Sequence, residues 1–326
     1  MTGDLFETLD KAGFGANVTQ VASQGDCRVL RLDDKTGEGF MTMYRLFDGV
    51  YLMYNDFHLR SCVSQYQNAE TMLCIDHCRE GRIEHENSLH EHYYMDAGTI
   101  RIDKRVHHEG KVELPLSHYH GMTIGFVSGE AEQSLCREMP FLSVDLKALG
   151  EKFCPDNKEF LIRENEQLSV IFSQLYHAPK AAKLDYFRVK TAELLLVLSS
   201  LDLNEHDRQG QYFPMRQTEK IKQIHSLITT SLERSYTIEQ LSERFMIAPA
   251  TLRKVFKAVY GTPVYRYIKT YKMKAAASML ISQPSLTVSQ IAQQLGYDNA
   301  SKFSAAFRDV MGASPQEYRN KEMEEI

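Results

Sequence analysis

The sequence predicts a two-domain protein with a β-barrel at its N-terminus, a helical segment after it, and an all-α domain at its C-terminus. Three observations support this fold class. Short alternating and aromatic segments, separated by Gly, Asp or Asn, recur through about the first 145 residues. Helical periodicity follows from about residue 155. The last hundred or so residues then contain one pattern written twice.

The domain boundaries are placed where the residue pattern changes. We expect the barrel at 1–150, the helical segment at 151–203, a linker at 204–216 and the C-terminal domain at 217–326. The linker is expected because its residues are mostly polar and lack apolar periodicity. A chain of 326 residues, 43% hydrophobic and 25% charged, has the size and composition of two globular domains.

The N-terminal strands are predicted from short runs of β-branched and aromatic residues. Many strands at this spacing favour a barrel or a sandwich. The predicted strands are Phe40–Tyr44, Gly49–Tyr54, Thr71–Ile75, Thr99–Ile102 and Met122–Val127.

The compartment is predicted from what the sequence lacks and from its cysteines. The N-terminus has no basic and then apolar run, and no apolar stretch reaches ~18 residues, so we expect a cytoplasmic protein with no membrane partner. The six cysteines are thinly spread, and in a reducing compartment we expect them to be free thiols.

The helical segment has two apolar stripes, and the second contains the nearly all-apolar run 194–198. A helix of this composition must be buried. Residues 184–198 either pack on their own barrel or form the seam of a homodimer, and the sequence leaves both open.

The doubled pattern is typical of a helix-turn-helix. Residues 237–245 read Thr-Ile-Glu-Gln-Leu-Ser-Glu-Arg-Phe, and residues 287–295 read Thr-Val-Ser-Gln-Ile-Ala-Gln-Gln-Leu. In each copy the Thr hydroxyl can accept a backbone N–H at the helix start, and apolar residues follow on one face. Each copy therefore predicts a short helix packed on one side.

A second helix is predicted after each short one. An apolar pair at i and i+4 seals it onto the first helix, and a Gly then ends it. Its exposed face would fit the major groove of DNA. The marks are Leu252, Phe256, Gly261 and Pro263 in the first copy, and Phe303, Phe307, Gly312 and Pro315 in the second.

A long helix is predicted between the two copies, from about Pro263 to Leu280. At ~1.5 Å per residue it would be ~27 Å long. This is a little less than the ~34 Å turn of B-DNA, so a rigid connector could set two recognition helices into successive major grooves.

Residues 217–322 resemble the DNA-binding domain of the AraC/XylS family of transcription regulators. The resemblance rests on the two copies in register, on the connector, where Lys272 stands in place of the more common Arg, and on the closing signature from Gly312 to Arg319. Residues 94–102 resemble a strand-turn-strand of the cupin barrel, the fold commonly joined to this domain. The resemblance implies a cupin-like sensing domain and a seven-helix DNA-binding domain.

The resemblance also assigns the residues that contact DNA. Arg253 is expected to read a base, because a guanidinium can donate two hydrogen bonds to guanine. Ala305 stands where the family commonly has Arg, so the second half is expected to rely on phosphate contacts and DNA shape. The alternative for Arg253, Lys254, Ser301 and Ser304 is an ordinary solvated helix face. The first set is Ala250, Thr251, Arg253, Lys254 and Lys257, and the second is Asn299, Ala300, Ser301, Lys302, Ser304, Ala305 and Arg308.

Charge agrees with this division. Residues 217–326 hold 15 Lys or Arg against 10 Asp or Glu, a net charge of +5, whereas the remaining 23 basic and 33 acidic residues give 1–216 a net charge of −10. The C-terminal domain therefore carries the local positive field that DNA attracts.

The barrel is expected to hold a small-molecule effector, since a barrel of this size can enclose one small ligand. Arg79 would suit an anionic ligand. His118 and His120 share a strand face as metal ligands do, and Cys74, His77 and Cys78 have ligand types, but neither group is complete, so we expect no metal and no cofactor. The candidate effector residues are Asn55, His58, His77, Arg79, Glu84, His118 and His120.

We therefore expect a DNA-binding transcription regulator, not an enzyme, with no catalytic residues. Its expected partners are promoter DNA, a second copy of the chain, an effector, and RNA polymerase if it is an activator, the family's commoner mode. The main alternative is a regulator without an effector, whose first domain serves only oligomerisation or protein contact. A metal-dependent barrel enzyme joined to a DNA-binding tail is the more distant alternative.

Overall fold

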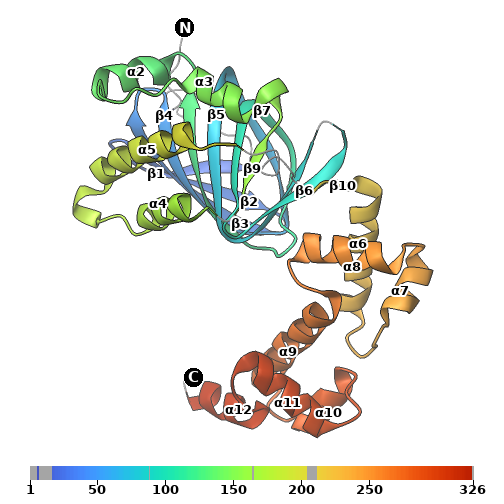
Figure 1. Ribbon diagram of the computed structural model, residues 1–326. Helices are drawn as coiled ribbons and strands as arrows, with labels where there is room; N and C mark the ends of the chain where they lie inside the picture. The colour runs from blue at the N-terminus through green and yellow to red at the C-terminus, as the bar shows by residue number, and fades with distance from the viewer. Residues whose placement is uncertain (1–5, 7–16, 88, 164, 204–210, 325–326) are drawn as a thin grey trace. The chain divides into compact units, whose positions relative to one another are not determined.

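The computed structural model describes residues 6, 17–87, 89–163, 165–203 and 211–324. The chain divides into two compact units (Figure 1). The first consists of Met1–Asn87 and Tyr93–Tyr212, and the second of Ser88–His92 and Phe213–Ile326. Within the described residues, no helix is both long and apolar enough to cross a bilayer.

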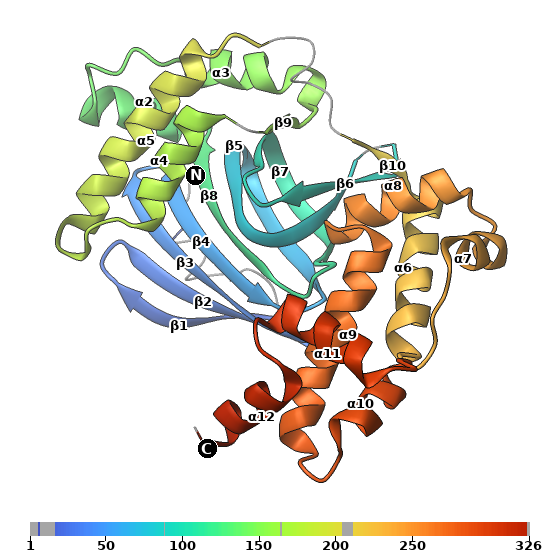
Figure 2. The same ribbon diagram turned by 60° about the horizontal axis from the view of Figure 1, so that its bottom comes forward.

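The first unit is built on a curved, largely antiparallel sheet that forms a half barrel (Figure 2). Neighbouring strands follow the order β1-β2-β3-β4-β8-β5-β6, with β7 on β5 and β9 on β7. The strands are β1 (Val18–Gln24), β2 (Cys27–Asp34), β3 (Gly37–Phe47), β4 (Val50–His58), β5 (Ser61–Glu86), β6 (Glu91–Asp96), β7 (Ile100–Glu113), β8 (Tyr119–Val127) and β9 (Phe160–Ile162).

Three of the five predicted strands lie inside observed ones, and the other two, Gly49–Tyr54 and Thr99–Ile102, begin one residue before β4 and β7. The predicted strand-turn-strand is also present. There, Gly98 turns the chain between β6 and β7 with a φ of +85°, a conformation that glycine adopts at no steric cost. The mostly β N-terminal fold is thus confirmed, while its cupin-like character stays a prediction.

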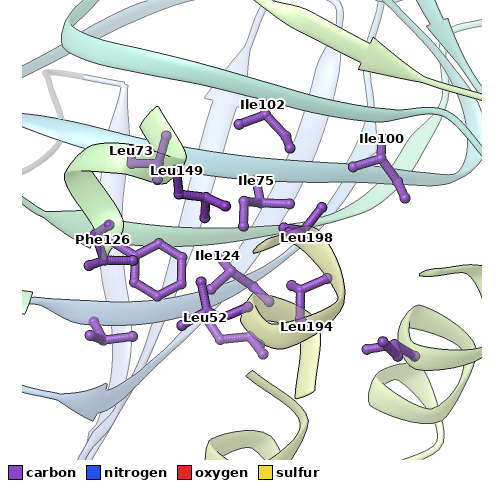
Figure 3. Packing of buried hydrophobic residues seen from close by; sticks show 14 of the residues in the cluster. Leu52, Leu73, Ile75, Ile100, Ile102, Ile124, Phe126, Leu149, Leu194 and Leu198 are labelled. Carbon is purple, nitrogen blue, oxygen red and sulfur yellow. The ribbon is translucent and has the colours of Figure 1, made fainter. Parts of the chain in front are cut away.

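The two faces of the sheet have different neighbours, because successive side chains of a strand point to opposite faces. One row crosses four strands: Leu52 of β4 lies opposite Ile124 of β8, which lies opposite Ile75 of β5, which pairs with Ile102 of β7. All four side chains are fully buried. Figure 3 shows this row packed against Leu149, Leu194 and Leu198.

Those three leucines belong to helices that cover this face of the sheet (Figures 1 and 2). The helical part begins at Glu130, earlier than the predicted residue 151, and β9 interrupts it. The early start reflects α2, which buries Ala131 and Leu135 in the same core. The helices are α2 (Glu130–Glu138), α3 (Leu146–Phe153), α4 (Glu166–Tyr176) and α5 (Lys183–Ser200), with single 3-10 turns at Pro155–Asn157 and Lys180–Ala182.

Helix α5 packs on its own sheet, which was one of the two alternatives for residues 184–198. Phe187, Leu194, Leu195 and Leu198 are all fully buried in the core beneath it. The other side of α5 still exposes apolar side chains, Val189 and Leu196.

The second unit is helical. A two-residue strand, β10 (Phe213–Pro214), pairs with Glu91 and His92, and α6 follows at once, so helix begins at Met215, inside the predicted linker. Residues 204–210 of that linker lie outside the described residues. Seven helices follow within residues 211–324: α6 (Met215–Thr230), α7 (Ile238–Phe245), α8 (Pro249–Tyr260), α9 (Val264–Ser282), α10 (Val288–Gln294), α11 (Ala300–Met311) and α12 (Pro315–Glu324).

Candidate nucleic-acid interface

The two copies of the repeated pattern form two matching helix pairs, α7 with α8 and α10 with α11. Thr237 begins the first and Thr287 the second, each accepting a hydrogen bond from the backbone N–H three residues on, at 3.1 and 3.2 Å. In turn, the side-chain oxygens of Gln240 and Gln290 accept hydrogen bonds from the backbone N–H groups of Thr237 and Thr287, at 2.9 and 2.8 Å. Such reciprocal caps satisfy two donors at each helix start.

The second helix of each pair is sealed and ended as predicted. Leu252 and Phe256 of α8 are fully buried, and so are Phe303 and Phe307 of α11. Each helix then stops at a left-handed glycine, Gly261 with φ +77° and Gly312 with φ +78°. One face of each helix is fixed in a core, which leaves the opposite face free to contact a ligand.

On α8 the outward face is basic. Ala250, Arg253, Lys254 and Lys257 are exposed, and Thr251 is half-buried. Arg253 lies 3.6 Å from Glu239 of α7, but both side chains are more than half exposed, so this ion pair holds the guanidinium weakly. The predicted base-reading residue is therefore available to a partner.

On α11 the predicted residues divide into two kinds. Ser301, Lys302, Ala305 and Arg308 are exposed, and Ala300 and Ser304 are half-buried. Asn299 caps the helix instead, because its side-chain oxygen accepts from the backbone N–H groups of Ser301 at 2.8 Å and Lys302 at 3.2 Å. The N–H donors of the Asn299 side-chain amide remain for contacts with DNA.

The two helix pairs are joined at a junction on α9, and the sequence did not predict this junction. Lys272 is buried, and its Nζ donates to the carbonyl of Leu295 at 2.9 Å and to that of Arg234 at 3.4 Å. Burial lowers the pKa of Lys272, opposed by Glu233. One ammonium group thus links the end of α10 to the loop before α7.

A glycine completes this junction. Gly296 follows α10 with φ +74°, and a Cβ at this position would lie 2.2 Å from the carbonyl oxygen of Glu233. Only glycine lets the two backbones approach so closely. Together with α9, which at ~1.5 Å per residue is ~28 Å long, the junction fixes the spacing between the two pairs.

The closing signature holds the second pair together. Ser314 and Glu317 cap α12 reciprocally, with distances of 2.7 and 3.3 Å. Arg319 reaches back to the carbonyls of Leu280 at 3.3 Å and Leu286 at 2.7 Å, at the end of α9 and in the loop after it. These residues therefore stabilise the fold of the domain.

The first unit contains a cavity of about 180 Å³ on the inner face of the sheet, which is the face opposite to the one that the helices cover. Of the seven predicted effector residues, Asn55 lines it and the other six do not. His77, Arg79 and His120 gather instead around Tyr176 of α4, on the face that the helices cover. The structure therefore does not bring the seven side chains together, because neighbours along a strand point to opposite faces.

The remaining predicted effector residues have other partners. His58 and His118 lie with ring centroids 5.3 Å apart, beside Asp56 and Glu80 respectively. Glu84 is buried and accepts a 2.6 Å hydrogen bond from the Tyr94 hydroxyl.

The same alternation separates Cys74 and Cys78 from His77. The two thiols belong to the core of the inner face, whereas the His77 ring stacks on Phe172 of α4 at 4.3 Å between centroids. Burial, with a smaller effect from Arg79, lowers the pKa of His77 to about 4. No group of three or more His, Cys, Asp or Glu side chains with metal-binding geometry occurs among the described residues.

Comparison with known proteins agrees with the paired helices. Residues 241–321 match the family model of a helix-turn-helix domain. A transcriptional activator of Mannheimia succiniciproducens, RhaR, is 22% identical over 165 residues, which cover 51% of this chain and 57% of that protein. A putative AraC-like transcription regulator of Streptomyces lividans is 33% identical over 86 residues, 26% of this chain and 28% of that one.

Among solved structures, the C-terminal domain of AraT, a response regulator of Geobacillus stearothermophilus, is 28% identical and covers 31% of this chain and 84% of that one, with a TM-score of 0.30. The chain spans about half the length of the RhaR proteins that it matches, or a little more.

The fold and the exposed basic helix define a DNA-binding module with two helix-turn-helix motifs. The C-terminal domain is an AraC-family helix-turn-helix domain.

Proposed function

We propose that the protein is a sequence-specific transcription regulator that reads two adjacent major-groove segments of promoter DNA. The observation that carries the proposal is the pair of matching helix-turn-helix motifs, each with an outward recognition helix, tied by one junction on α9. A helix of this width fits the major groove, and fixed spacing allows both to be read at once. The relatives named transcriptional activators favour activation as its mode.

In this proposal the two halves contribute differently. Arg253 reads a base through its guanidinium, with Lys254 and Ala250 beside it, and Lys257 contacts phosphate. The half that contains α11 has Ser301, Lys302 and Arg308 outward, so it contributes mainly phosphate contacts.

The first unit is proposed to sense a small molecule and to dimerise. An inner cavity supports the sensing role. Dimerisation is supported by the apolar side chains that α5 leaves exposed, Val189 and Leu196, which lie beside the exposed Phe141 around a surface groove. A ligand would regulate DNA binding only if it bound two states of the protein with different affinities.

The first test is selection of genomic fragments by the purified full-length protein, followed by sequencing, at near-physiological salt. Sharp enrichment upstream of a few genes is the expected result. Enrichment no greater than that of random fragments, both for the full chain and for a fragment of residues 211–326, would contradict the proposal.

Two variants then separate base reading from phosphate contact. Arg253→Ala should weaken binding to the selected site by ~1–3 kcal/mol and relax preference at one base pair. Lys302→Ala should weaken all sequences alike and reduce the salt dependence by about one phosphate contact. Equal losses on selected and random DNA for Arg253→Ala would refute its role.

The alternative is a regulator that responds to no small molecule. It is favoured if a broad metabolite set produces no thermal shift of the purified protein and promoter binding is the same with and without those metabolites.

A further inference from the structure

We propose that the first unit binds a divalent transition-metal ion such as Zn²⁺ through His58 and His118, where β4 ends and β8 begins. The binding follows from the arrangement of these side chains alone. A role of the metal as a regulatory signal would rest on the proposed function.

The two histidines face each other across a strand pair. Strands β4 and β8 are antiparallel with Phe57 opposite Tyr119, so His58, the last residue of β4, comes opposite His118. Residues in such opposite positions share a face of the sheet, with Cβ atoms ~4.5–5.5 Å apart. The two imidazole rings have centroids 5.3 Å apart and planes tilted by 35°.

This separation suits a shared metal ion. Two imidazole nitrogens bound to one tetrahedral Zn²⁺ at ~2.1 Å place their ring centroids ~5 Å apart. Imidazole is a preferred ligand of zinc, copper and nickel, whereas Mg²⁺ and Ca²⁺ take oxygen ligands. The pair should therefore select a late transition-metal ion over the hard cations.

Each histidine also has a carboxylate beside it. His58 Nε2 lies 3.0 Å from Asp56 Oδ1, and His118 Nε2 lies 3.7 Å from Glu80 Oε2. Neighbouring ligand atoms in a tetrahedral zinc site are ~3.4 Å apart, so each carboxylate is within reach of a metal on its histidine. A carboxylate that instead accepts the N–H of the ligating ring makes that ring a stronger ligand.

The charge around the pair favours a cation. Asp56 and Glu80 bring two negative charges, which are partly offset by Arg79, whose Nε lies 3.8 Å from Glu80 Oε1. A metal ion that replaced the protons between the imidazoles and the carboxylates would keep both carboxylates paired.

The two histidines form an open site rather than a closed one. As the described side chains stand, no three His, Cys, Asp or Glu groups converge on one point. The side chains are free enough to adjust, since 64% of the His58 surface and 34% of that of His118 are exposed. We therefore expect water to fill the remaining positions and the affinity to be lower than that of a closed structural zinc site.

The structure pairs His118 with a different residue from the one that the sequence suggested. His118 and His120 lie on the same strand face, but the His120 ring packs edge-on against Tyr176 of α4, with centroids 5.6 Å apart. Strand pairing instead brings in His58, which is 60 residues away in the sequence. The proposed site lies on the sheet face that carries Met122 and Ile124, opposite the inner cavity.

The test is a calorimetric titration of Zn²⁺ into the full-length protein, with Mg²⁺ as the comparison. Cys136→Ser is used throughout, because Cys136 is an exposed thiol that could bind zinc itself. Bound metal is first removed with EDTA, which is then removed by desalting. We expect Zn²⁺ to bind and Mg²⁺ not to bind. Absence of Zn²⁺ binding would overturn the inference.

Co²⁺ used in place of Zn²⁺ reports the kind of ligand. Thiolate ligands give bound Co²⁺ an intense charge-transfer band in the near ultraviolet, whereas imidazole and carboxylate ligands do not. We expect binding without this band. A thiolate band that grows with the tightest binding event would place the metal on the cysteines and overturn the inference.

Two variants identify the ligands. His58→Gln and His118→Gln should each weaken the tightest Zn²⁺ binding by at least about tenfold, because one histidine cannot chelate. His177→Gln is the matched control, an exposed histidine whose Nδ1 lies 2.7 Å from the Ser173 carbonyl, and it should bind Zn²⁺ like the parent.

Thermal unfolding of the same variants keeps the result interpretable. Without metal, we expect all of them to unfold at the temperature of the parent, since the replaced rings are at least partly exposed. With Zn²⁺, only the parent and His177→Gln should be stabilised. Zn²⁺ affinity that survives in both His58→Gln and His118→Gln would overturn the assignment.

Promoter binding by the same preparations separates this inference from the proposed function. Failure to bind Zn²⁺ in a protein that still selects promoter DNA overturns the inference alone. Failure to select DNA, with and without Zn²⁺, in a protein that binds the metal contradicts the proposed function alone.

Discussion

Lys272→Met is the substitution that best tests how the two helix pairs are held together. Methionine keeps most of the length of the lysine stem inside the domain but removes the ammonium group. Two carbonyls then lose their donor, that of Leu295 at 2.9 Å and that of Arg234 at 3.4 Å. A hydrogen bond from a charged donor contributes about 1.5–3 kcal/mol net. Counting the longer bond at less than half, we expect a loss of about 2–4 kcal/mol in the stability of the second unit.

The assay is hydrogen exchange of the full-length protein, read on peptides of the second unit. Peptides that contain Leu295 and Arg234 should lose protection in Lys272→Met. Lys274→Met, on the exposed side of the same helix, is the matched control and should change stability little. Lys272→Arg should restore much of the loss, because a guanidinium can also donate to both carbonyls.

DNA binding provides a second measure. If the junction fixes the spacing of the recognition helices, Lys272→Met should weaken binding to a duplex with both half-sites more than to a duplex with one. Ordinary surface substitutions change stability by about 0.5 kcal/mol or less. If the stability of Lys272→Met lies within that range of the stability of Lys274→Met, and two-site binding is unchanged, Lys272 does not hold the two helix pairs together.

Two further predictions concern positions where the structure offers a matched control. At Gly312, with φ +78°, an added Cβ would meet open space, so Gly312→Ala should lower the free energy of unfolding by about 1–2 kcal/mol from backbone strain alone. Gly296→Ala should lower it by a further ~1–3 kcal/mol, because its Cβ would meet the Glu233 carbonyl. Equal losses of stability in chemical unfolding would contradict the close approach at Gly296. Because burial lowers the pKa of His77 from 6.5 to about 4, the unfolded chain gains a proton before the folded one as pH falls. The stability that neutral His77 contributes is complete above about pH 6.5 and should fall by up to about 3 kcal/mol by pH 4. His77→Phe should remove this part of the pH dependence, the exposed His177→Phe should retain it, and identical pH profiles for both would show that His77 is not buried as a neutral ring.

The C-terminal domain could be predicted from the sequence almost element by element. Its helices are specified by local signals, such as the caps at Thr237 and Thr287 and the glycines at 261 and 312, and each signal acts within one turn of helix. The outward positions of Arg253 and Lys302 follow from helical periodicity once the buried pairs are known. The tertiary contacts are consistent with these local signals and do not override them.

The seven candidate effector residues stay a prediction, but the sequence did not reveal that they lie apart from one another, and the reason is physical. Histidines and charged groups were chosen by residue type, but the face to which a strand side chain points depends on register, and a shift of one residue reverses it. His77 and Asp76 are neighbours in sequence, yet one stacks on Phe172 and the other lines the cavity. The residues that define the cavity, such as Met53 and Thr123, carry no local signal of a site.

The sequence by itself determined the class of the fold, the doubled helix-turn-helix and the face of each recognition helix, because these depend on patterns within about 20 residues. The tertiary structure alone decided three other features. They are that α5 packs on its own sheet, that Lys272 joins the carbonyls of Arg234 and Leu295, which are 61 residues apart, and that Thr123 links Asn55 and Asp76, which lie on the strands to either side of it. Each depends on which distant segments become neighbours, and that is fixed by strand register and core packing over the whole unit.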